Sequence, residues 1–203
     1  TLPIPLLMRD FYNQGETNAC TGFAGAWISS FNNSIPNQRY DAQKLYREGQ
    51  NNDLDVRNDP NLDIGGYVWA VMHVLQKFGP VKWGETTPTL SAGINNYYWA
   101  RSVDEVRTAI ALKRLVNFGI GWYENFSVPQ KLNKEWWIGD GNLGKIQGGH
   151  SIVCYGASDK RGAFKLINSW GMNYHPVWLP YTIFERLLKE NGEACIVVDK
   201  AKQ

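Results

Sequence analysis

The sequence has few cysteines, no long apolar segment and almost no excess of either charge. Its three cysteines are odd in number and lie far apart, which excludes a disulfide framework or a zinc ribbon. No apolar run approaches the roughly 20 residues of a membrane-spanning helix, so we expect no membrane span. Lys and Arg total 21 against 19 Asp and Glu, and this balance argues against binding nucleic acid through bulk charge.

The length and composition are those of a small globular protein. The 203 residues fit one domain or two small lobes, enough to bury about 70% of the surface of the unfolded chain. The chain begins Thr-Leu-Pro-Ile-Pro, without an initiating Met or the basic and apolar segments of a signal peptide. We therefore expect a soluble, processed or excised domain.

The N-terminal half is predicted to be mostly helical. Five apolar residues at helical spacing follow Cys20, so Cys20 should lie in the first turn of a buried helix, with Thr17 or Asn18 as its N-cap. These apolar residues are Phe23, Ala24, Trp27, Ile28 and Phe31. The polar stretch 50–63 reads as a surface loop, and residues 67–78 as a second helix, stopped by the Gly-Pro pair that follows.

The C-terminal half is predicted to be mostly antiparallel sheet. Ser102 opens a helix through a capping-box pattern with Glu105. Further elements are expected as follows: strands over 116–122, 151–156, 163–167 and 193–199, and a helix over 181–189. The chain is therefore expected to be α+β, a single domain over 1–203 with a helical lobe at about 10–95 and a β-rich lobe at about 96–203.

Four separate side chains form a candidate catalytic set. A thiolate is favoured at a helix N-terminus and beside an imidazolium, so Cys20 is a candidate nucleophile and His150 its base. The Asn168 carboxamide would accept from the imidazole N–H and fix the ring and its tautomer. The Gln14 amide and the backbone N–H of Cys20 would then stabilise an oxyanion.

These blocks resemble those of the papain-like cysteine peptidases, more closely their prokaryotic or phage-type members than the lysosomal cathepsins. The resemblance runs from about Leu2 to Tyr181. Its blocks, in the family's order, are Asn13-Gln14-Gly15 before Cys20, Asp63-Ile-Gly-Gly-Tyr67, Gly149-His150 and Asn168-Ser-Trp-Gly171. The histidine and the asparagine follow the cysteine by 130 and 148 residues, within the spacing already known for this family.

The resemblance implies a two-lobed fold and a thiol peptidase that hydrolyses peptide bonds through a thioester acyl-enzyme. Peptide or protein substrates are expected to lie extended between the lobes, with no metal and no other cofactor. The substrate backbone would pair with Gly65 and Gly66, with Tyr67 beside them. Trp170 would shield the hydrogen bond between the histidine and the asparagine from water. We expect a monomer.

The chain departs from the family's pattern at several positions. Thr17 stands where the family has a cysteine of a first-lobe disulfide, so that lobe is expected to hold by packing alone. The missing disulfide favours an intracellular or virion setting. Thr21 replaces a tryptophan, and Met-Asn-Tyr-His follows Gly171 in place of the usual Trp-Gly-rich continuation.

Several alternatives stay open. Cys20 alone could be a small core residue, although the complete set argues against that reading. The same pair of thiol and imidazole would serve a Cys-His amidase of cell-wall peptides or a transglutaminase-like acyl transferase, and a catalytically inactive papain-fold binding module is a third possibility. Trp136-Trp137 invites a carbohydrate-binding reading, with core packing favoured. Cys154 and Cys195 read as core residues that would pair only if their strands were neighbours.

Overall fold

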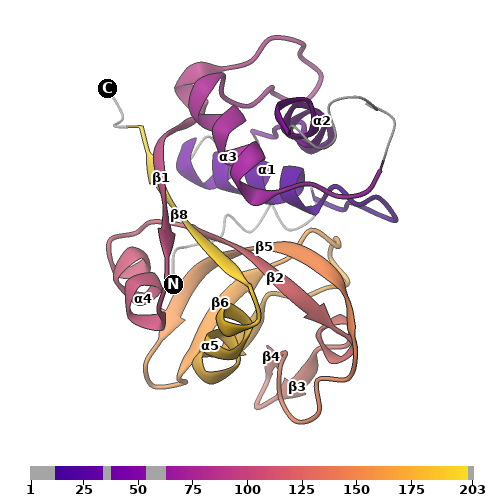
Figure 1. The fold of residues 1–203 in the computed structure, drawn as a ribbon, viewed down its shortest axis with the longest axis vertical. Helices are drawn as coiled ribbons and strands as arrows, with labels where there is room; N and C mark the ends of the chain where they lie inside the picture. Colours follow the sequence, from indigo (N-terminus) through magenta and orange to yellow (C-terminus); the bar gives the residue numbers. More distant parts are fainter. Residues whose placement is uncertain (1–11, 34–37, 54–62, 201–203) are drawn as a thin grey trace. The chain divides into compact units, whose positions relative to one another are not determined.

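The computed structural model describes residues 12–33, 38–53 and 63–200. In these residues it contains five α-helices, α1 (Cys20–Asn33), α2 (Ala42–Asn52), α3 (Val68–Lys77), α4 (Val103–Ala111) and α5 (Tyr181–Lys189) (Figure 1). Eight strands accompany them, β1 (Ile94–Ala100), β2 (Val116–Tyr123), β3 (Gln130–Leu132), β4 (Glu135–Trp137), β5 (Ile146–Ser158), β6 (Ala163–Ile167), β7 (Val177–Pro180) and β8 (Glu193–Asp199). The expected α+β class is confirmed.

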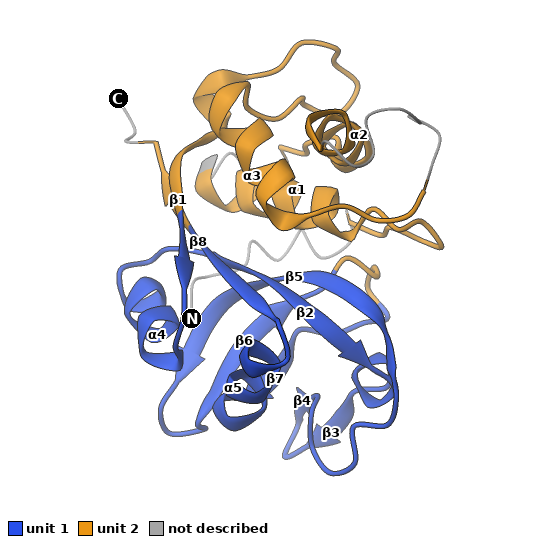
Figure 2. Cartoon of the chain, in the orientation of Figure 1, with its two compact units in different colours: residues 1–3, 98–168, 173–196 blue, residues 4–97, 169–172, 197–203 orange. Residues whose placement is uncertain are grey.

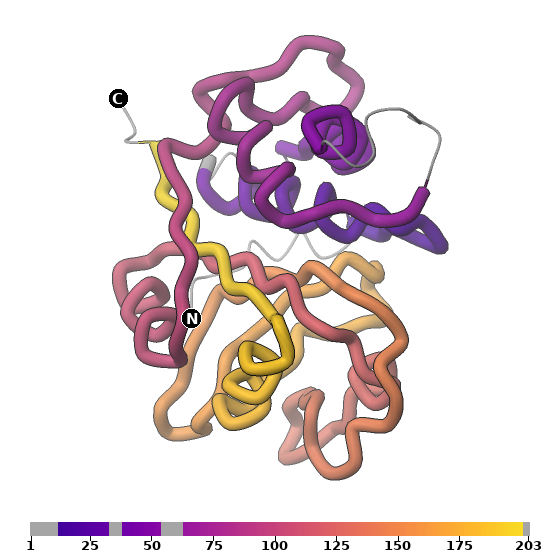
Figure 3. Tube along the Cα trace, viewed as in Figure 1, coloured from indigo at the N-terminus to yellow at the C-terminus, as the bar shows by residue number. Residues whose placement is uncertain are grey.

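The chain divides into two compact units, coloured separately in Figure 2. The helical unit holds α1, α2 and α3 together with residues 169–172 and 197–200, and the sheet unit holds residues 98–168 and 173–196. Strands β1 and β8 each have residues in both units (Figure 2), and Figure 3 traces the chain in sequence colours.

Helix α1 is buried along most of its length, as its apolar spacing predicts. Trp27 and Ile28 are almost completely buried, and the Tyr12 ring packs edge-on against Trp27 at 5.0 Å. A Cβ atom on Gly22 would overlap the backbone carbonyl of Ala42, so only glycine allows α1 and α2 to approach this closely. The helical unit therefore depends on small residues at helix contacts as much as on large apolar ones.

Helix α2 was not expected from the sequence, and part of the predicted loop over 50–63 belongs to it. Asp41 caps this helix by accepting from the backbone N–H of Lys44 at 3.0 Å. Gln50 lies in the last turn and is buried. Its amide donates to the Tyr46 hydroxyl at 2.9 Å, so the buried polar group has a hydrogen-bond partner. The prediction of a loop was wrong for residues 50–52, and residues 54–62 lie outside the described residues.

The predicted ends of two other helices are confirmed. Helix α3 stops before Gly79, whose φ of +78° is a left-handed conformation that favours glycine. Helix α4 begins after Ser102, whose hydroxyl accepts from Glu105 N–H at 3.2 Å. The Glu105 carboxylate returns to the backbone N–H of Arg101, one residue before the capping residue that the pattern predicted.

The sheet has the strand order β1-β8-β2-β5-β6-β7-β4-β3. From β8 to β3 in this order, each strand pairs with the next in antiparallel orientation, except that β7 and β4 pair in parallel. Helix α5 packs against the sheet through Phe184, which stacks on Phe118 of β2 at 4.4 Å and meets Phe164 of β6 edge-on at 5.0 Å. This aromatic cluster fixes β2 and β6, the strands on either side of β5, which carries His150.

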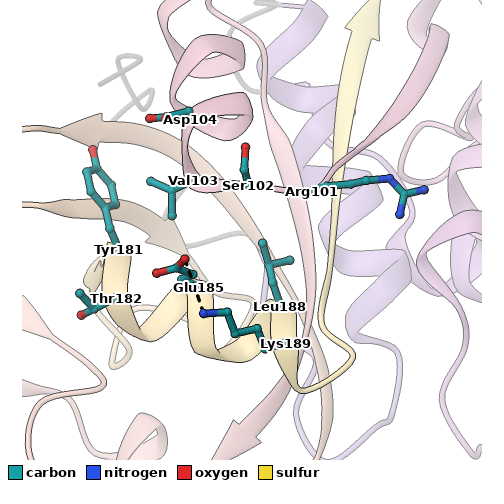
Figure 4. Close-up of a pocket in the computed structure, with 9 residues that line it drawn as sticks. All are labelled: Arg101, Ser102, Val103, Asp104, Tyr181, Thr182, Glu185, Leu188 and Lys189. Atoms are coloured by element: carbon teal, nitrogen blue, oxygen red, sulfur yellow. Dashed lines mark ion pairs between the residues drawn. The ribbon is translucent and has the colours of Figure 1, made fainter.

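A pocket of about 450 Å³ lies in the sheet unit, beside the start of α4 and along α5 (Figure 4). Glu185 and Lys189 form a 3.6 Å ion pair on its α5 side. None of the candidate residues lines this pocket, so it is separate from the candidate active site. Within the described residues, no helix is both long and apolar enough to cross a membrane.

Candidate active site

Cys20 is the first residue of α1 and its side chain is partly exposed. The carbonyl of Ala19 accepts the first helical hydrogen bond, from the N–H of Phe23 at 3.1 Å, so Ala19 occupies the N-cap position. The prediction that Thr17 or Asn18 caps this helix was wrong. Their side chains donate instead to the backbone carbonyls of Gln14 and Asp63. Alanine has no side-chain oxygen, so no cap side chain offsets the positive end of the helix dipole at the sulfur.

The Gln14 carboxamide is held at both of its ends. Its Oε1 accepts from the Ser169 hydroxyl at 2.7 Å, and its Nε2 donates to the carbonyl of Thr17 at 2.8 Å. The backbone N–H of Gln14 also donates to the Ser169 carbonyl at 2.8 Å. All three residues belong to the helical unit, in which Cys20 also lies. The amide is therefore fixed in orientation in the segment that leads to the thiol.

A carboxylate joins the Cys20 segment to the Gly-Gly segment. Asp63 accepts from the backbone N–H of Asn18 at 3.1 Å, and the Asn18 side chain donates to the Asp63 carbonyl at 2.6 Å. The Tyr46 hydroxyl donates to Asp63 at 2.8 Å and accepts from Gly65 N–H at 3.1 Å. These hydrogen bonds add to the packing of the lobe in the segment where the family's disulfide is missing.

The glycine pair lies next to α1 in the helical unit. Gly65 has φ +93°, and a Cβ atom there would meet nothing within 4 Å. A Cβ atom on Gly66 would lie 3.3 Å from the hydroxyl of Thr21, the residue after Cys20. Tyr67 is 52% exposed just before α3. The structure thus brings the proposed substrate-binding glycines and the candidate nucleophile into one unit.

His150 and Asn168 meet in the sheet unit. His150 lies on β5 opposite Ile120 of β2, and Asn168 directly follows β6, which pairs with β5. The imidazole Nε2 and the Asn168 Oδ1 are 2.8 Å apart. Because a carbonyl oxygen only accepts hydrogen bonds, Nε2 carries the proton and Nδ1 keeps its lone pair. This tautomer can accept a proton at Nδ1.

The surroundings of His150 keep its ring neutral. Its side chain is 8% exposed, and the Trp122 indole packs edge-on against it at 4.5 Å between ring centroids. Burial lowers the pKa of His150 to about 4, and the hydrogen bond with Asn168 opposes that shift only in part. At neutral pH the imidazole is therefore unprotonated and able to act as a base.

Trp170 lies in the helical unit, where it pairs with Asn13 through an isolated antiparallel bridge. Gly171 has φ +69° and donates its N–H to the carbonyl of Tyr12 at 3.1 Å. The Ser-Trp-Gly segment is thus fixed to the chain just before Gln14. The role expected for Trp170 beside the histidine stays a prediction.

The other two thiols do not have the environment of a nucleophile. Cys154 and Cys195 are completely buried, and burial raises the pKa of each well above its ordinary value. All three cysteines lie in the described part of the chain, and none forms a disulfide. Cys154 on β5 and Cys195 on β8 are kept apart because β2 lies between their strands. Cys20 is therefore the one candidate nucleophile among the three thiols.

Two further observations concern ligands. Within the described residues, no group of three or more His, Cys, Asp or Glu side chains is arranged to hold a metal ion. Trp136 stacks on His175 at 4.7 Å, and Trp137 lies against Trp178 at 6.1 Å, all in the sheet unit. Both tryptophans of the pair are half-buried, one stacked on a neighbouring ring and the other tilted against one, which favours a packing role over carbohydrate binding.

The residues that support the candidate set were not predicted from the sequence. Ser169 holds Gln14, Asp63 and Tyr46 hold the glycine segment, and Trp122 covers His150. Ser169 and Asp63 lie inside the sequence blocks that carry the resemblance, so their positions could have marked them as residues near the site. Trp122 was recognised only as an apolar strand residue, and nothing in the sequence pairs it with a histidine.

Two solved structures resemble this chain over nearly its whole length. Xylellain, a cysteine protease from Xylella fastidiosa, is 19% identical with a TM-score of 0.72, covering 98% of this chain and 85% of xylellain. The Carica candamarcensis cysteine protease CMS1MS2, in complex with E-64, is 13% identical with a TM-score of 0.64, covering 94% of this chain and 92% of its own. No protein-family model and no curated protein sequence matches the chain.

These likenesses establish the fold as the α+β, papain-like fold of cysteine proteases. The bacterial xylellain also agrees with the resemblance to prokaryotic members. At 19% and 13% identity the likeness shows the fold, whereas an activity depends on the site residues themselves.

Proposed function

We propose that this protein is a papain-like thiol peptidase. The observation that carries the proposal is the 2.8 Å hydrogen bond between His150 Nε2 and Asn168 Oδ1 around a buried, neutral imidazole. A fixed imidazole with its lone pair on Nδ1 is the base that thiol catalysis requires. Cys20, at the start of α1, supplies the partly exposed thiol, and the fold is one that cysteine proteases use.

In the first half of the reaction, Cys20 Sγ attacks the carbonyl carbon of the scissile bond while its proton passes to Nδ1 of His150. The oxyanion that forms accepts from the second amide hydrogen of Gln14 and from the backbone N–H of Cys20. The C–N bond then breaks, and the imidazolium gives its proton to the leaving amine. The product is a thioester on Cys20.

In the second half, His150 takes a proton from water, and the resulting hydroxide attacks the thioester carbonyl. The C–S bond breaks, the proton returns to sulfur, and the acid product leaves. Asn168 keeps the ring oriented through both halves by accepting from Nε2–H. Trp170 would exclude water from that hydrogen bond.

The substrate of this proposal is an extended peptide or protein segment. Its backbone would pair with Gly65 and Gly66, where the absence of side chains lets another backbone approach closely. The exposed ring of Tyr67 would contact a substrate side chain nearby. The chain would act as a single peptidase domain, and a monomer satisfies every step of the mechanism.

The proposal is tested by labelling with E-64, the compound bound by the Carica protease, followed by mass spectrometry of the peptides. We expect one adduct, on Cys20, and complete loss of labelling and of peptide cleavage in Cys20→Ala. Cys154 and Cys195 serve as internal controls, since both are buried and should stay unlabelled until the protein is denatured. An adduct on either of them in the native protein would overturn the assignment.

A turnover assay, run beside the labelling, separates the alternative functions. A peptide library and cell-wall peptide fragments are offered to the enzyme in parallel. Cleavage of library peptides supports a peptidase, whereas turnover of cell-wall fragments alone, or transfer of the acyl group to an added amine, identifies an amidase or a transglutaminase-like enzyme. A protein that folds but neither labels nor turns over is the inactive binding module.

A further inference from the structure

The Trp122 indole, which packs against His150, is fixed by a hydrogen bond of its own. It is buried, and its Nε1–H donates to the hydroxyl of Ser127 at 3.0 Å. An indole N–H only donates, so the Ser127 oxygen is the acceptor in this bond. The single hydrogen of that hydroxyl is donated in turn to Oε1 of Gln147 at 3.1 Å. Both bonds therefore have a determined direction.

Gln147 reaches that hydroxyl at a point where β5 has one residue more than its partner strand. Trp122 of β2 pairs with Gly148 of β5. The next residue of β2 pairs with Ile146, which leaves Gln147 as the extra residue of a bulge. A bulge changes the direction of a side chain, and bulges are common beside active sites. Here the bulged residue carries the amide that orients the hydroxyl bonded to the indole.

Ser127 is the last residue of a short 3₁₀-helix, η3 (Glu124–Ser127), which is itself well packed. Phe126 of this helix is completely buried, and its ring meets the Trp122 indole edge-on at 5.3 Å. The Tyr174 hydroxyl donates to the backbone carbonyl of Phe126 at 2.6 Å. The serine that holds the indole therefore belongs to a turn that packing and a hydrogen bond fix in place.

The hydrogen bond with Asn168 alone does not fix the plane of the imidazole. It holds Nε2 of His150 at 2.8 Å from the amide oxygen, but the torsion about the Cβ–Cγ bond of a histidine has broad minima. Rotation about that bond changes the direction in which Nδ1 points. The Trp122 indole lies 4.5 Å from the imidazole with 61° between the ring planes, so a rotating imidazole would run into it.

We propose that Ser127 is a positioning residue that acts through Trp122: its hydroxyl holds the indole against His150, and the indole fixes the direction of Nδ1 and keeps water from the ring. Gln147 accepts the hydrogen of the hydroxyl and so leaves an oxygen lone pair for the indole. All four residues belong to the sheet unit. Ser127, Trp122 and Gln147 lie outside the sequence blocks that carry the resemblance, so the resemblance does not imply this role.

The test follows the imidazole by nuclear magnetic resonance as the pH is lowered, in wild type, Ser127→Ala, Ser127→Thr and Ser158→Ala. Without the hydroxyl the indole is released and water reaches the ring, so the pKa of His150 in Ser127→Ala should rise from about 4 by about one pH unit. Ser127→Thr keeps a hydroxyl and should restore the wild-type value. Ser158→Ala is the matched control, because Ser158 is the last residue of the same strand and should leave the titration unchanged. Equal values in Ser127→Ala and wild type would overturn the proposal.

The titratable groups on the neighbouring elements are the same in all four proteins. The Tyr123 hydroxyl of β2 donates to Glu190 at 2.7 Å, and its pKa is raised by that carboxylate. Burial raises the pKa of Tyr174, so both phenols stay neutral over the measured range. Glu124 is exposed at the start of η3, and its protonation is common to every variant. A rise confined to Ser127→Ala therefore reports the release of the indole.

A second measurement needs no variant and so does not depend on the folding of Ser127→Ala. In the wild-type protein the Nε1–H of Trp122 should exchange slowly with water, and hydrogens of the indole should show nuclear Overhauser effects to the imidazole of His150. Trp83 is the internal reference for fast exchange, because it is 63% exposed. Exchange of the Trp122 hydrogen as fast as that of Trp83 would contradict the proposed hydrogen bond.

The kinetic consequence rests on the proposed function. Ser127→Ala should lower kcat about tenfold and leave KM unchanged, because the base is misaligned while substrate binding is kept. In a Trp122→Phe background, which has no N–H to hold, the same change should cost nothing further. A further tenfold loss there, or a raised KM with unchanged kcat, would show that Ser127 does not act through the indole. A raised pKa of His150 in a variant of a protein without peptidase activity would reject the proposed function and keep the positioning role.

Discussion

At the scale of single residues, the Gln14 carboxamide provides the sharpest test of the oxyanion site. Gln14→Ala should lower kcat about a hundredfold, the usual effect of removing one such donor. Ser169→Ala should lower it about tenfold, because the amide keeps its bond to Thr17 but loses the hydroxyl that holds its oxygen. Steady-state kinetics on one peptide substrate measure both effects.

Ser91→Ala is a suitable control for the serine variant, since Ser91 is exposed in the same unit. It should retain the wild-type rate. Equal rates for Ser169→Ala and wild type would mean that Gln14 needs no second anchor, and an unchanged rate in Gln14→Ala would remove Gln14 from the mechanism.

The identities of the candidate residues were predictable, but the hydrogen bonds that hold them in place were not. Residue types and spacing point to Cys20, His150 and Asn168 before any coordinates are known. The bond between Ser169 and Gln14 joins residues 155 positions apart, and no periodicity in the sequence carries that information. The orientation of an amide depends on which neighbour donates and which accepts, and only the folded chain brings those neighbours together.

At the scale of elements, the strongly patterned segments were predicted and the weakly patterned ones were not. Apolar spacing predicted α1 and α3, and alternation predicted β2. Helix α2 was missed because most of its residues are polar, and its buried Gln50 is satisfied by hydrogen bonds that the sequence does not reveal. Strands β3 and β4 have three residues each, too few for alternation to show.

The link between Asp63 and the Cys20 segment is an element-scale feature with a measurable effect. Asp63→Ala removes the acceptor of the Asn18 N–H and of the Tyr46 hydroxyl, so the free energy of unfolding should fall by about 2 kcal/mol. Burial and the neighbouring carboxylate raise the pKa of Tyr46 to about 12, so its hydroxyl remains a donor at neutral pH. Urea denaturation followed by fluorescence measures the loss.

The control for Asp63→Ala is Asp140→Ala, because Asp140 is exposed in the other unit. It should leave stability within about 0.5 kcal/mol of wild type. The kinetics of Asp63→Ala should also show a raised KM if the Gly65 segment binds substrate. Wild-type stability in Asp63→Ala would mean that packing alone holds the helical unit, as the sequence first suggested.

At the scale of the whole molecule, segments distant in the sequence complete each unit. Residues 169–172 belong to the helical unit because Ser169 bonds to Gln14 and Gly171 bonds to Tyr12. The chain therefore passes from one unit to the other between Asn168 and Ser169, two adjacent residues of a single sequence block. A substitution in this block can affect both units, so each variant there needs a stability measurement beside its kinetics.

The buried imidazole makes the stability of the whole protein depend on pH. The pKa of His150 is about 4 in the folded protein and about 6.5 in an unfolded chain, so between these values the unfolded state binds more protons. The free energy of unfolding should therefore fall as the pH is lowered from 6.5 to 4, by about 3 kcal/mol in full. Urea titrations of wild type and His150→Gln across this range measure the effect.

The difference between the two titrations isolates the histidine. Other groups also titrate in this range, among them Glu193, whose pKa is raised by burial and which favours the folded state as the pH falls. Such groups are common to both proteins and cancel in the difference. The wild-type curve should be steeper than that of His150→Gln, and parallel curves would show that His150 is protonated as easily in the folded state as in the unfolded one. That result would remove the neutral, buried base on which the proposed chemistry depends.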